Sequence, residues 1–270
     1  KAHLVGILGH VEPRVHGFAA VHVWCDPSLL DALPNAPWLI KHCPERAGAS
    51  MVRQLWWERF VLPGQVRQAR CDLLFNVDAG TVCRFRPAVT MSRDMLSFEP
   101  GEIKRYGWGK ARLRLLLLRS VQQASLRDAD GAVFLTRYAG ETILGYTGSL
   151  NNVDFVPHGV ADDFRRPTPT SCPEPHAAGT PIRCLYVSNV APYKHQWHVV
   201  RAVRTLRERG YDAHLTLTGG GAGGGASTAQ RRLDAELADS DPGRAFTRQL
   251  GYVPHQALPG ILAAADLFVF

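Results

Sequence analysis

The sequence lacks the patterns that would assign it to several large protein classes. It has no C-x-x-C pair; its six cysteines are scattered, at positions 25, 43, 71, 83, 172 and 184. This scatter is typical of reduced thiols in a cytosolic protein and not of a disulfide framework. No apolar run is long enough to span a bilayer, and no signal peptide is recognisable. The P-loop and the G-x-S-x-G elbow of hydrolases are both absent.

The composition is that of an ordinary globular protein with an excess of positive charge. The chain has 270 residues, of which 46% are hydrophobic and 20% are charged. This length gives room for two domains, each with its own core. The net charge of +7 favours anionic partners. Nucleotide sugars, acidic lipid headgroups and nucleic acid all fit that description, and charge alone does not choose among them.

Short apolar runs alternate with helical patterns along the whole chain. We expect strands at residues 4–8, 21–24, 72–77, 87–91, 131–135, 153–156, 182–187, 213–218, 250–253 and 267–270. The run at 72–77 has the continuous apolar character of a buried parallel strand. Helical patterns lie between these runs, with Asp26 and Thr136 as helix starts. This alternation predicts an α/β protein with two doubly wound, Rossmann-like domains.

A proline-rich segment marks the expected domain boundary. Residues 165–181 contain five prolines and no periodicity, so we interpret them as a linker. The predicted domains are therefore residues 1–164 and 182–270. Because the sequence ends in an apolar strand with no loop behind it, we expect the second domain to be incomplete.

The most informative stretch is residues 183–203. A short β-branched strand is followed by a turn with a proline, and a helical pattern begins at Lys194. A strand, short loop and helix place an anion site at the carboxyl end of the strand. A lysine at the helix start can add its charge to a bound phosphate. A surface lysine on an ordinary β-α unit explains the spacing equally well.

Four motifs, in this order and spacing, resemble the GT-B retaining glycosyltransferases of family four. They are V-P-H-G-V at 156–160, S-N-V-x-P-Y-K-H-Q at 188–196, L-T-G-G-G at 217–221 and L-G-Y-V-P at 250–254. The resemblance covers most of the chain and is strongest from about Val89 onward. It implies an enzyme that transfers a hexose from a nucleotide-sugar donor with retention of configuration and without a metal or other cofactor.

The resemblance also implies roles for particular residues. On the donor side it implies contacts from Lys194, Ser188, Gly219, Gly220 and Val253. The arginine that the family has six residues before the lysine is replaced here by Ser188, which can donate a hydrogen bond but brings no charge. The family's E-x7-E segment would lie beyond Phe270.

On the acceptor side, a strand ends in Arg93 and Asp94, where the family has His-Asp. Arginine is permanently charged and cannot act as a base, but it can hold a phosphate or a hydroxyl. An Arg93–Asp94 surface pair is the structural alternative. His158 and Gly159 match the turn where the chain passes from the first domain to the second.

Residues 102–127 read as one long basic helix. Seven basic residues and an apolar stripe that includes Leu113, Leu116 and Leu117 would let it lie on an anionic membrane surface. A core helix with a solvated basic face fits the same pattern. We therefore expect a cytoplasmic protein that can attach to the inner face of the membrane.

Two classes of function remain at this point. The first is a glycosyltransferase that acts on a surface polysaccharide, a lipopolysaccharide or another glycan or lipid-linked acceptor. The second is a non-catalytic remnant, or a basic α/β module that binds membrane or nucleic acid. A GT-B-shaped epimerase or phosphorylase is a third possibility. The histidine spacings H-x-x-C at 22–25 and H-x-x-H at 195–198 lack further ligands, so no metal site is expected. For a glycosyltransferase, no nucleic-acid partner is expected.

Overall fold

A computed structural model describes residues 2–44, 50–165, 179–220 and 228–270. The chain divides into two compact units, Lys1–Gly159 and Val160–Phe270. Most of the linker expected at 165–181 lies outside the described residues, as does Cys172. No disulfide links the five cysteines in the described part.

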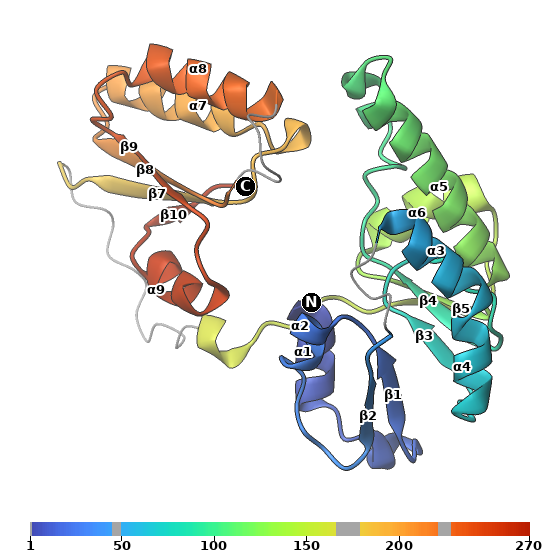
Figure 1. The fold of residues 1–270 in the computed structure, drawn as a ribbon. Helices are drawn as coiled ribbons and strands as arrows, with labels where there is room; N and C mark the ends of the chain where they lie inside the picture. Colours follow the sequence, from blue (N-terminus) through green and yellow to red (C-terminus); the bar gives the residue numbers. More distant parts are fainter. Residues whose placement is uncertain (1, 45–49, 166–178, 221–227) are drawn as a thin grey trace. The chain divides into compact units, whose positions relative to one another are not determined.

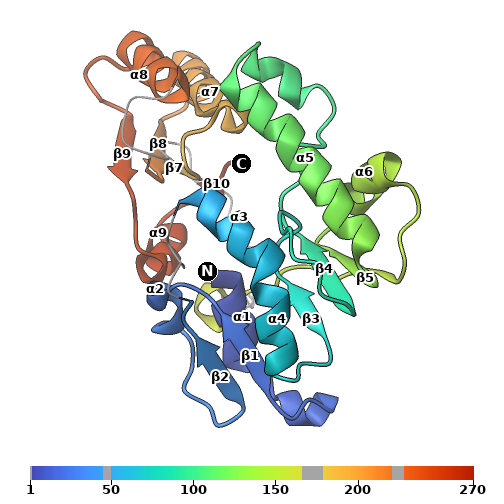
Figure 2. The same ribbon diagram turned by 45° about the vertical axis from the view of Figure 1, so that its right-hand side comes forward.

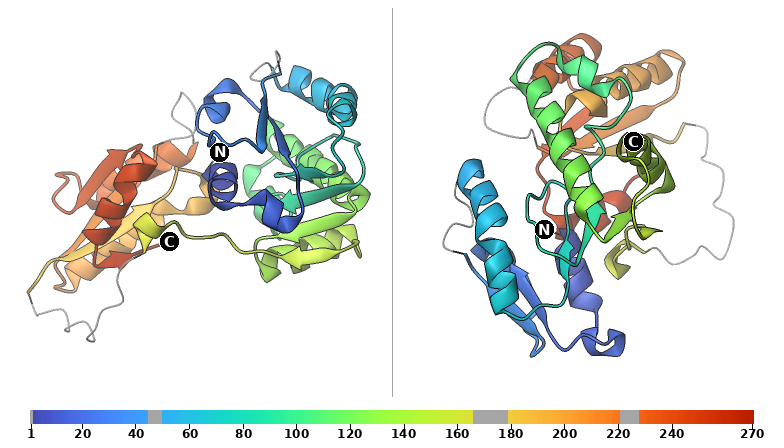
Figure 3. Two further views of the ribbon diagram at one scale, coloured as in Figure 1. Left: turned by 90° about the horizontal axis from the view of Figure 1, so that it is seen from below. Right: turned by 90° about the vertical axis from the view of Figure 1, so that its right-hand side faces the viewer.

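The first unit contains two parallel sheets. The smaller sheet pairs β1 (Val21–Trp24) with β2 (Leu39–His42), apart from the larger one (Figure 3). The larger sheet has the order β3 (Leu74–Asn76), β4 (Ala88–Ser92), β5 (Gly131–Phe134), β6 (Val153–Phe155). Because β3 is an edge strand, its residues are only partly covered, and the prediction of a buried strand there was wrong.

Two helices cover one face of the larger sheet. The helices α5 (Lys110–Asp128) and α6 (Arg137–Thr147) bury Leu126 and Ile143 against Phe134 of β5. Thr136 begins α6 as predicted, since its side-chain oxygen accepts from the N–H of Ala139 at 3.1 Å. The core of this unit therefore lies between strands and helices that the sequence predicted.

The helical pattern at 50–70 is two helices, α3 (Met51–Phe60) and α4 (Leu62–Gln68), which follow one another as a bent column (Figure 2). Helix α4 buries Val66 in a cluster that also includes Trp24 of β1 and Leu74 of β3. This cluster connects the small sheet to the large one. The short helix α2 (Pro27–Leu30) is capped by Asp26, as expected.

Two further sequence predictions in this unit were wrong. The expected strand at 4–8 is part of helix α1 (Ala2–His10), which packs Leu4 and Leu8 against the small sheet. The expected helix at 102–127 is a 3-10 turn at Glu102–Tyr106 followed by α5. Gly107 interrupts it with a φ of 60°, a conformation that a helix cannot contain.

The second unit has a single four-stranded parallel sheet. Its order is β10 (Leu267–Phe268), β7 (Ile182–Val187), β8 (Ala213–Thr218), β9 (Thr247–Gly251). The bounds of β7 and β8 agree with the prediction, whereas β9 begins three residues before the expected 250–253. Strands and helices alternate in both units, so the predicted doubly wound α/β fold is confirmed.

Helices cover both faces of this sheet. Helices α7 (Gln196–Glu208) and α8 (Thr228–Ser240) lie side by side on one face, and α9 (Leu258–Ala263) lies on the other (Figure 1). The core under α7 and α8 contains Trp197, Val200 and Leu233, all buried. None of the helices in the described ranges has the length and apolar content to cross a membrane.

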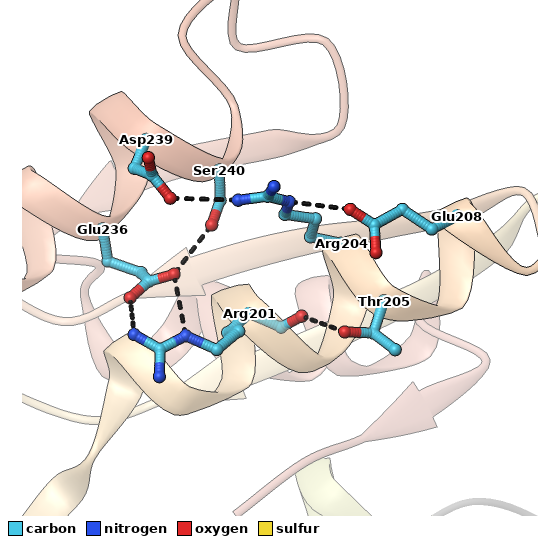
Figure 4. Close-up of polar contacts among 7 residues, drawn as sticks. All are labelled: Arg201, Arg204, Thr205, Glu208, Glu236, Asp239 and Ser240. Atoms are coloured by element: carbon cyan, nitrogen blue, oxygen red, sulfur yellow. Dashed lines mark hydrogen bonds and ion pairs between the residues drawn. The ribbon is translucent and has the colours of Figure 1, made fainter.

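An ion-pair network joins α7 to α8 (Figure 4). Arg201 forms a fork with the carboxylate of Glu236, which is only 8% exposed and also accepts from the Ser240 hydroxyl at 2.7 Å. The Arg201 hydrogen bonds hold the pKa of Glu236 below its ordinary value. Arg204 instead bridges Glu208 and Asp239, which are both exposed.

We expect Arg201→Met to lower the melting temperature of the protein by a few degrees and Arg204→Met to lower it less. The first change leaves a buried carboxylate without its partner, whereas the second removes surface pairs that contribute little. Differential scanning calorimetry of both variants measures this. Equal shifts would mean that the α7–α8 contact does not depend on the Glu236 pair.

Candidate functional site

A cavity opens at the carboxyl ends of β7, β8 and β9, on the side covered by α7 and α8. Its volume is about 210 Å³. Apolar side chains form its floor, and glycine backbone and glutamine side chains form the remaining wall; the lining residues are Val190, Gln196, Leu217, Gly219, Gly220, Gln230, Leu233, Gln249 and Gly251. This is the edge of a parallel α/β sheet where ligands bind. Gly219 and Gly220 were predicted to lie at such a site.

The turns after β7 and β8 are in direct backbone contact. Gly219 has a φ of 118°, and a Cβ atom at this position would lie 2.0 Å from the carbonyl oxygen of Ser188. Ser188 N–H donates to the Thr218 carbonyl at 2.9 Å, and Gly219 N–H donates to the Gly251 carbonyl at 2.7 Å. Only glycine permits both this φ and this approach. Ser188 and Gly219, two of the residues predicted to contact the nucleotide-sugar donor, therefore lie next to each other.

Gln196, which was not predicted as a site residue, is buried and holds the turn after β7 through a hydrogen bond. It is 1% exposed, and its Nε2 donates to the Ser188 carbonyl at 3.1 Å. Its Oε1 is buried and has no partner among the described residues. A buried amide oxygen in a cavity wall is an acceptor suited to an N–H group of a ligand. The sequence did hold one signal for Gln196: it follows Lys194 and His195 as the last residue of the S-N-V-x-P-Y-K-H-Q motif.

Lys194 does not begin a helix, contrary to the prediction. It ends the 3-10 turn Pro192–Lys194, and His195, with a φ of 53°, separates it from α7. The Tyr186 hydroxyl donates to the Lys194 carbonyl at 2.6 Å. The ammonium lies 4.2 Å from the ring centre of Phe270. Neither Lys194 nor Val253 is among the described residues that line the cavity.

Arg93 and Asp94 follow β4 at the carboxyl edge of the first unit's sheet, as expected. They do not pair with each other: Arg93 Nη2 donates to Asp78 Oδ2 at 3.0 Å, while Asp94 Oδ1 accepts from the Leu96 N–H at 2.8 Å. The alternative of an Arg93–Asp94 pair is therefore wrong. Asp78, which follows β3, is a neighbour that sequence spacing could not reveal.

His158 also lies at this edge, in the residues that follow β6. Its ring packs edge-on against His3 of α1, with ring centres 4.8 Å apart. Gly159, the other predicted interdomain residue, is the last residue of the first unit and has open space around it. The residues predicted to contact the donor and those predicted on the acceptor side thus lie in different units.

No group of three or more histidine, cysteine, aspartate or glutamate side chains is close enough to hold a metal ion in the described ranges. His22 contacts His42 at 2.9 Å and stacks with Trp24. The two histidines therefore belong to a packed aromatic cluster.

The chain is similar to known glycosyltransferases in sequence and in fold. It is 30% identical over 169 residues to a GDP-mannose-dependent alpha-(1-6)-phosphatidylinositol monomannoside mannosyltransferase of Mycolicibacterium smegmatis, a match that covers 60% of this chain and 40% of the relative. No family model matches the chain.

Two solved structures share the fold. Sucrose-phosphate synthase from Thermosynechococcus elongatus superposes with a TM-score of 0.69 at 14% identity, covering 95% of this chain and 66% of that one. HepE of Anabaena, in complex with UDP and glucose, superposes with a TM-score of 0.58 at 15% identity, covering 92% and 65%. The predicted resemblance to GT-B glycosyltransferases is thus confirmed, and the chain spans less than half of the mannosyltransferase's length.

We expect Gly219→Ala to destabilise the second unit by about 3–5 kcal/mol, because the new methyl group overlaps the Ser188 carbonyl and the φ is strained. Gly210→Ala is the matched control. Its φ of 90° brings the same kind of strain, but a Cβ there meets nothing within 4 Å, so the cost should be about 1–2 kcal/mol. Urea denaturation compares the two. Similar losses would show that the contact between the turns is looser than described.

Proposed function

We propose that this chain carries the donor-binding and acceptor-side sheets of a GT-B glycosyltransferase that moves a hexose from a nucleotide sugar to a glycan or lipid-linked acceptor, with retention and without a metal. The carrying observation is the cavity beside the Ser188–Gly219 backbone contact at the carboxyl edge of the second sheet. The motif order and the similarity to the mannosyltransferase support the same assignment.

On the donor side, the leaving diphosphate needs positive charge and N–H donors as its bond to the sugar breaks. Lys194 is the lysine of the S-N-V-x-P-Y-K-H-Q motif, and its ammonium forms no ion pair among the described residues. It rests on the face of Phe270, a contact that attracts an ammonium. The Ser188 hydroxyl and the Gly220 N–H would add hydrogen bonds, Gly219 would let the backbone approach the diphosphate closely, and Val253 would border the nucleotide.

The relatives suggest two alternatives for the base of the nucleotide, uracil and guanine. HepE is described with UDP and with UDP-glucose, and the mannosyltransferase is GDP-mannose-dependent. Both uracil and guanine have an N–H group that the buried Gln196 oxygen could accept from.

On the acceptor side, Arg93 and Asp94 stand where the carboxyl ends of the first sheet would face the substrate. Arg93 would hold an oxygen of donor or acceptor by charge-assisted hydrogen bonds, and it would not take a proton. The turn at His158 and Gly159 would carry the chain from one unit to the other.

The N-terminal part of α5 and the turn before it form an exposed surface that fits a membrane. Trp108 is 92% exposed, and Leu113 and Leu117 are 58% and 59% exposed. Five basic residues lie in the same stretch of the chain, namely Lys104, Arg105, Lys110, Arg112 and Arg114. Exposed apolar side chains together with cations suit the headgroup region of an anionic bilayer. We propose peripheral attachment to the cytoplasmic face through this surface.

The donor assignment predicts that Lys194→Ala weakens binding of a nucleoside diphosphate. A charge-assisted contact is worth about 1.5–3 kcal/mol, so the affinity should fall roughly 10- to 150-fold. Isothermal titration with UDP and with GDP measures this. Arg209→Ala, an exposed change in the same unit at the far end of α7, should leave affinity unchanged. Unaltered binding by a folded Lys194→Ala variant would remove this residue from the site.

The membrane assignment predicts flotation with vesicles that contain phosphatidylglycerol at low salt, with less recovery as salt rises. Replacing Trp108 by Ala should reduce flotation, because it removes the most exposed apolar side chain of the surface. Trp56→Ala is the control, since Trp56 is exposed on α3. Equal recovery with neutral vesicles, or equal loss in both variants, would count against this surface.

A further inference from the structure

Two cysteines lie opposite each other at the carboxyl end of the small sheet. The parallel register pairs Trp24 of β1 with His42 of β2, so Cys25 and Cys43 are the next residues along the two strands. The Cys25 N–H donates to the His42 carbonyl at 3.3 Å, which continues the hydrogen-bond pattern of the sheet by one residue. Pro44 has no N–H, so the pairing ends there. The backbone therefore holds the two cysteines side by side at the last step of the ladder.

Both thiols belong to the same face of the sheet. Side chains alternate between the two faces of a strand, so Cys25 lies on the face of Val23, and Cys43 lies on the face of Leu39. Val23 and Leu39 are buried in one cluster with Leu8 of α1, and Cys25 packs against this cluster. Residues opposite each other on neighbouring strands have Cα atoms about 4.8 Å apart. A disulfide spans Cα separations of about 4.4–6.8 Å, so the pair has the spacing for one.

The two thiols differ in exposure, which favours an oxidation site. Among the cysteines in the described ranges, Cys43 is the exposed one, and Cys25 is half-buried. The others, Cys71, Cys83 and Cys184, are partly or fully buried, and burial raises the pKa of each of these thiols. A raised pKa keeps a thiol protonated, whereas the thiolate is the form that reacts with oxidants. An oxidant in solution therefore meets Cys43 first, with Cys25 as its neighbour.

We propose that Cys25 and Cys43 form a reversible disulfide when the protein meets a peroxide. Hydrogen peroxide transfers one oxygen atom to the Cys43 sulfur, which gives a sulfenic acid and one molecule of water. The Cys25 sulfur then attacks the Cys43 sulfur, and the hydroxyl group leaves with the Cys25 proton as a second water. Two thiols and one peroxide thus give one disulfide and two waters. Two molecules of a small thiol, oxidised to their own disulfide, return both cysteines to the reduced state.

The bond closes a loop that contains α2 and β2. A sheet of two strands is marginal by itself, and this one depends on its packing against neighbouring helices. A covalent link at its open end restricts the unfolded chain, so oxidation should make this part of the first unit harder to unfold. The proposal is independent of the proposed function, because it uses neither the cavity of the second unit nor any residue assigned to a substrate.

The test is disulfide mapping of the whole chain before and after mild treatment with hydrogen peroxide. Remaining thiols are capped with N-ethylmaleimide, and trypsin, which cuts after Lys41, separates the two cysteines into peptides 15–41 and 42–46. After oxidation we expect these two peptides to be joined, two of the six thiols to be lost and the melting temperature to rise by several degrees. A thiol reductant should restore all three starting values.

Cys43→Ser is the diagnostic variant, because it changes an exposed side chain and leaves the fold intact. It should abolish both the joined peptide and the rise in melting temperature. Cys71→Ser is the matched control in the same unit and should keep both. In Cys25→Ser, the sulfenic acid on Cys43 should persist and react with dimedone. Disulfides that join other cysteines, or equal capping of Cys25 and Cys43 with and without peroxide, would overturn the proposal.

Discussion

The close approach of the Ser188 carbonyl to Gly219 is the constraint on which the second unit depends. The turn after β7 rests directly on the turn after β8, and the Gly219 N–H continues the contact to Gly251 at the end of β9. Gln196 holds the same carbonyl from inside the helix layer. Because backbone atoms tie three strand ends together, part of the cavity wall consists of the peptide groups of Gly219, Gly220 and Gly251, and a ligand can approach these more closely than it can approach side chains.

The regular part of the fold could be predicted from the sequence because local patterns determine it. Strands β7 and β8 were predicted with the right bounds, since β7 is a short apolar, β-branched run and β8 alternates apolar and polar residues. Segment 4–8 was misassigned because a short apolar run fits strand and helix alike. Leu4 and Leu8 are four residues apart, the helical spacing, and their common contact with the small sheet decides between the two.

The candidate sites were predictable only where a motif marks them. Gly219 and Gly220 were predicted from the L-T-G-G-G motif of the resemblance, and both line the cavity. Gln249 and the pairing of Arg93 with Asp78 were missed, since they depend on strand order and register. Lys194 is a third case, because the motif pointed to the residue but not to its place in the fold. His195 adopts a left-handed conformation that moves the helix start to Gln196, and nothing in the sequence indicates this conformation.

The most direct test of the account is a crystal structure of the protein with a nucleoside diphosphate bound. The account predicts density for the diphosphate at the carboxyl ends of β7 and β8, beside Gly219, with its oxygens within hydrogen-bond distance of the Gly220 N–H and of Lys194. Nucleotide bound at another edge of the molecule, with the Gly220 N–H facing solvent, would contradict it.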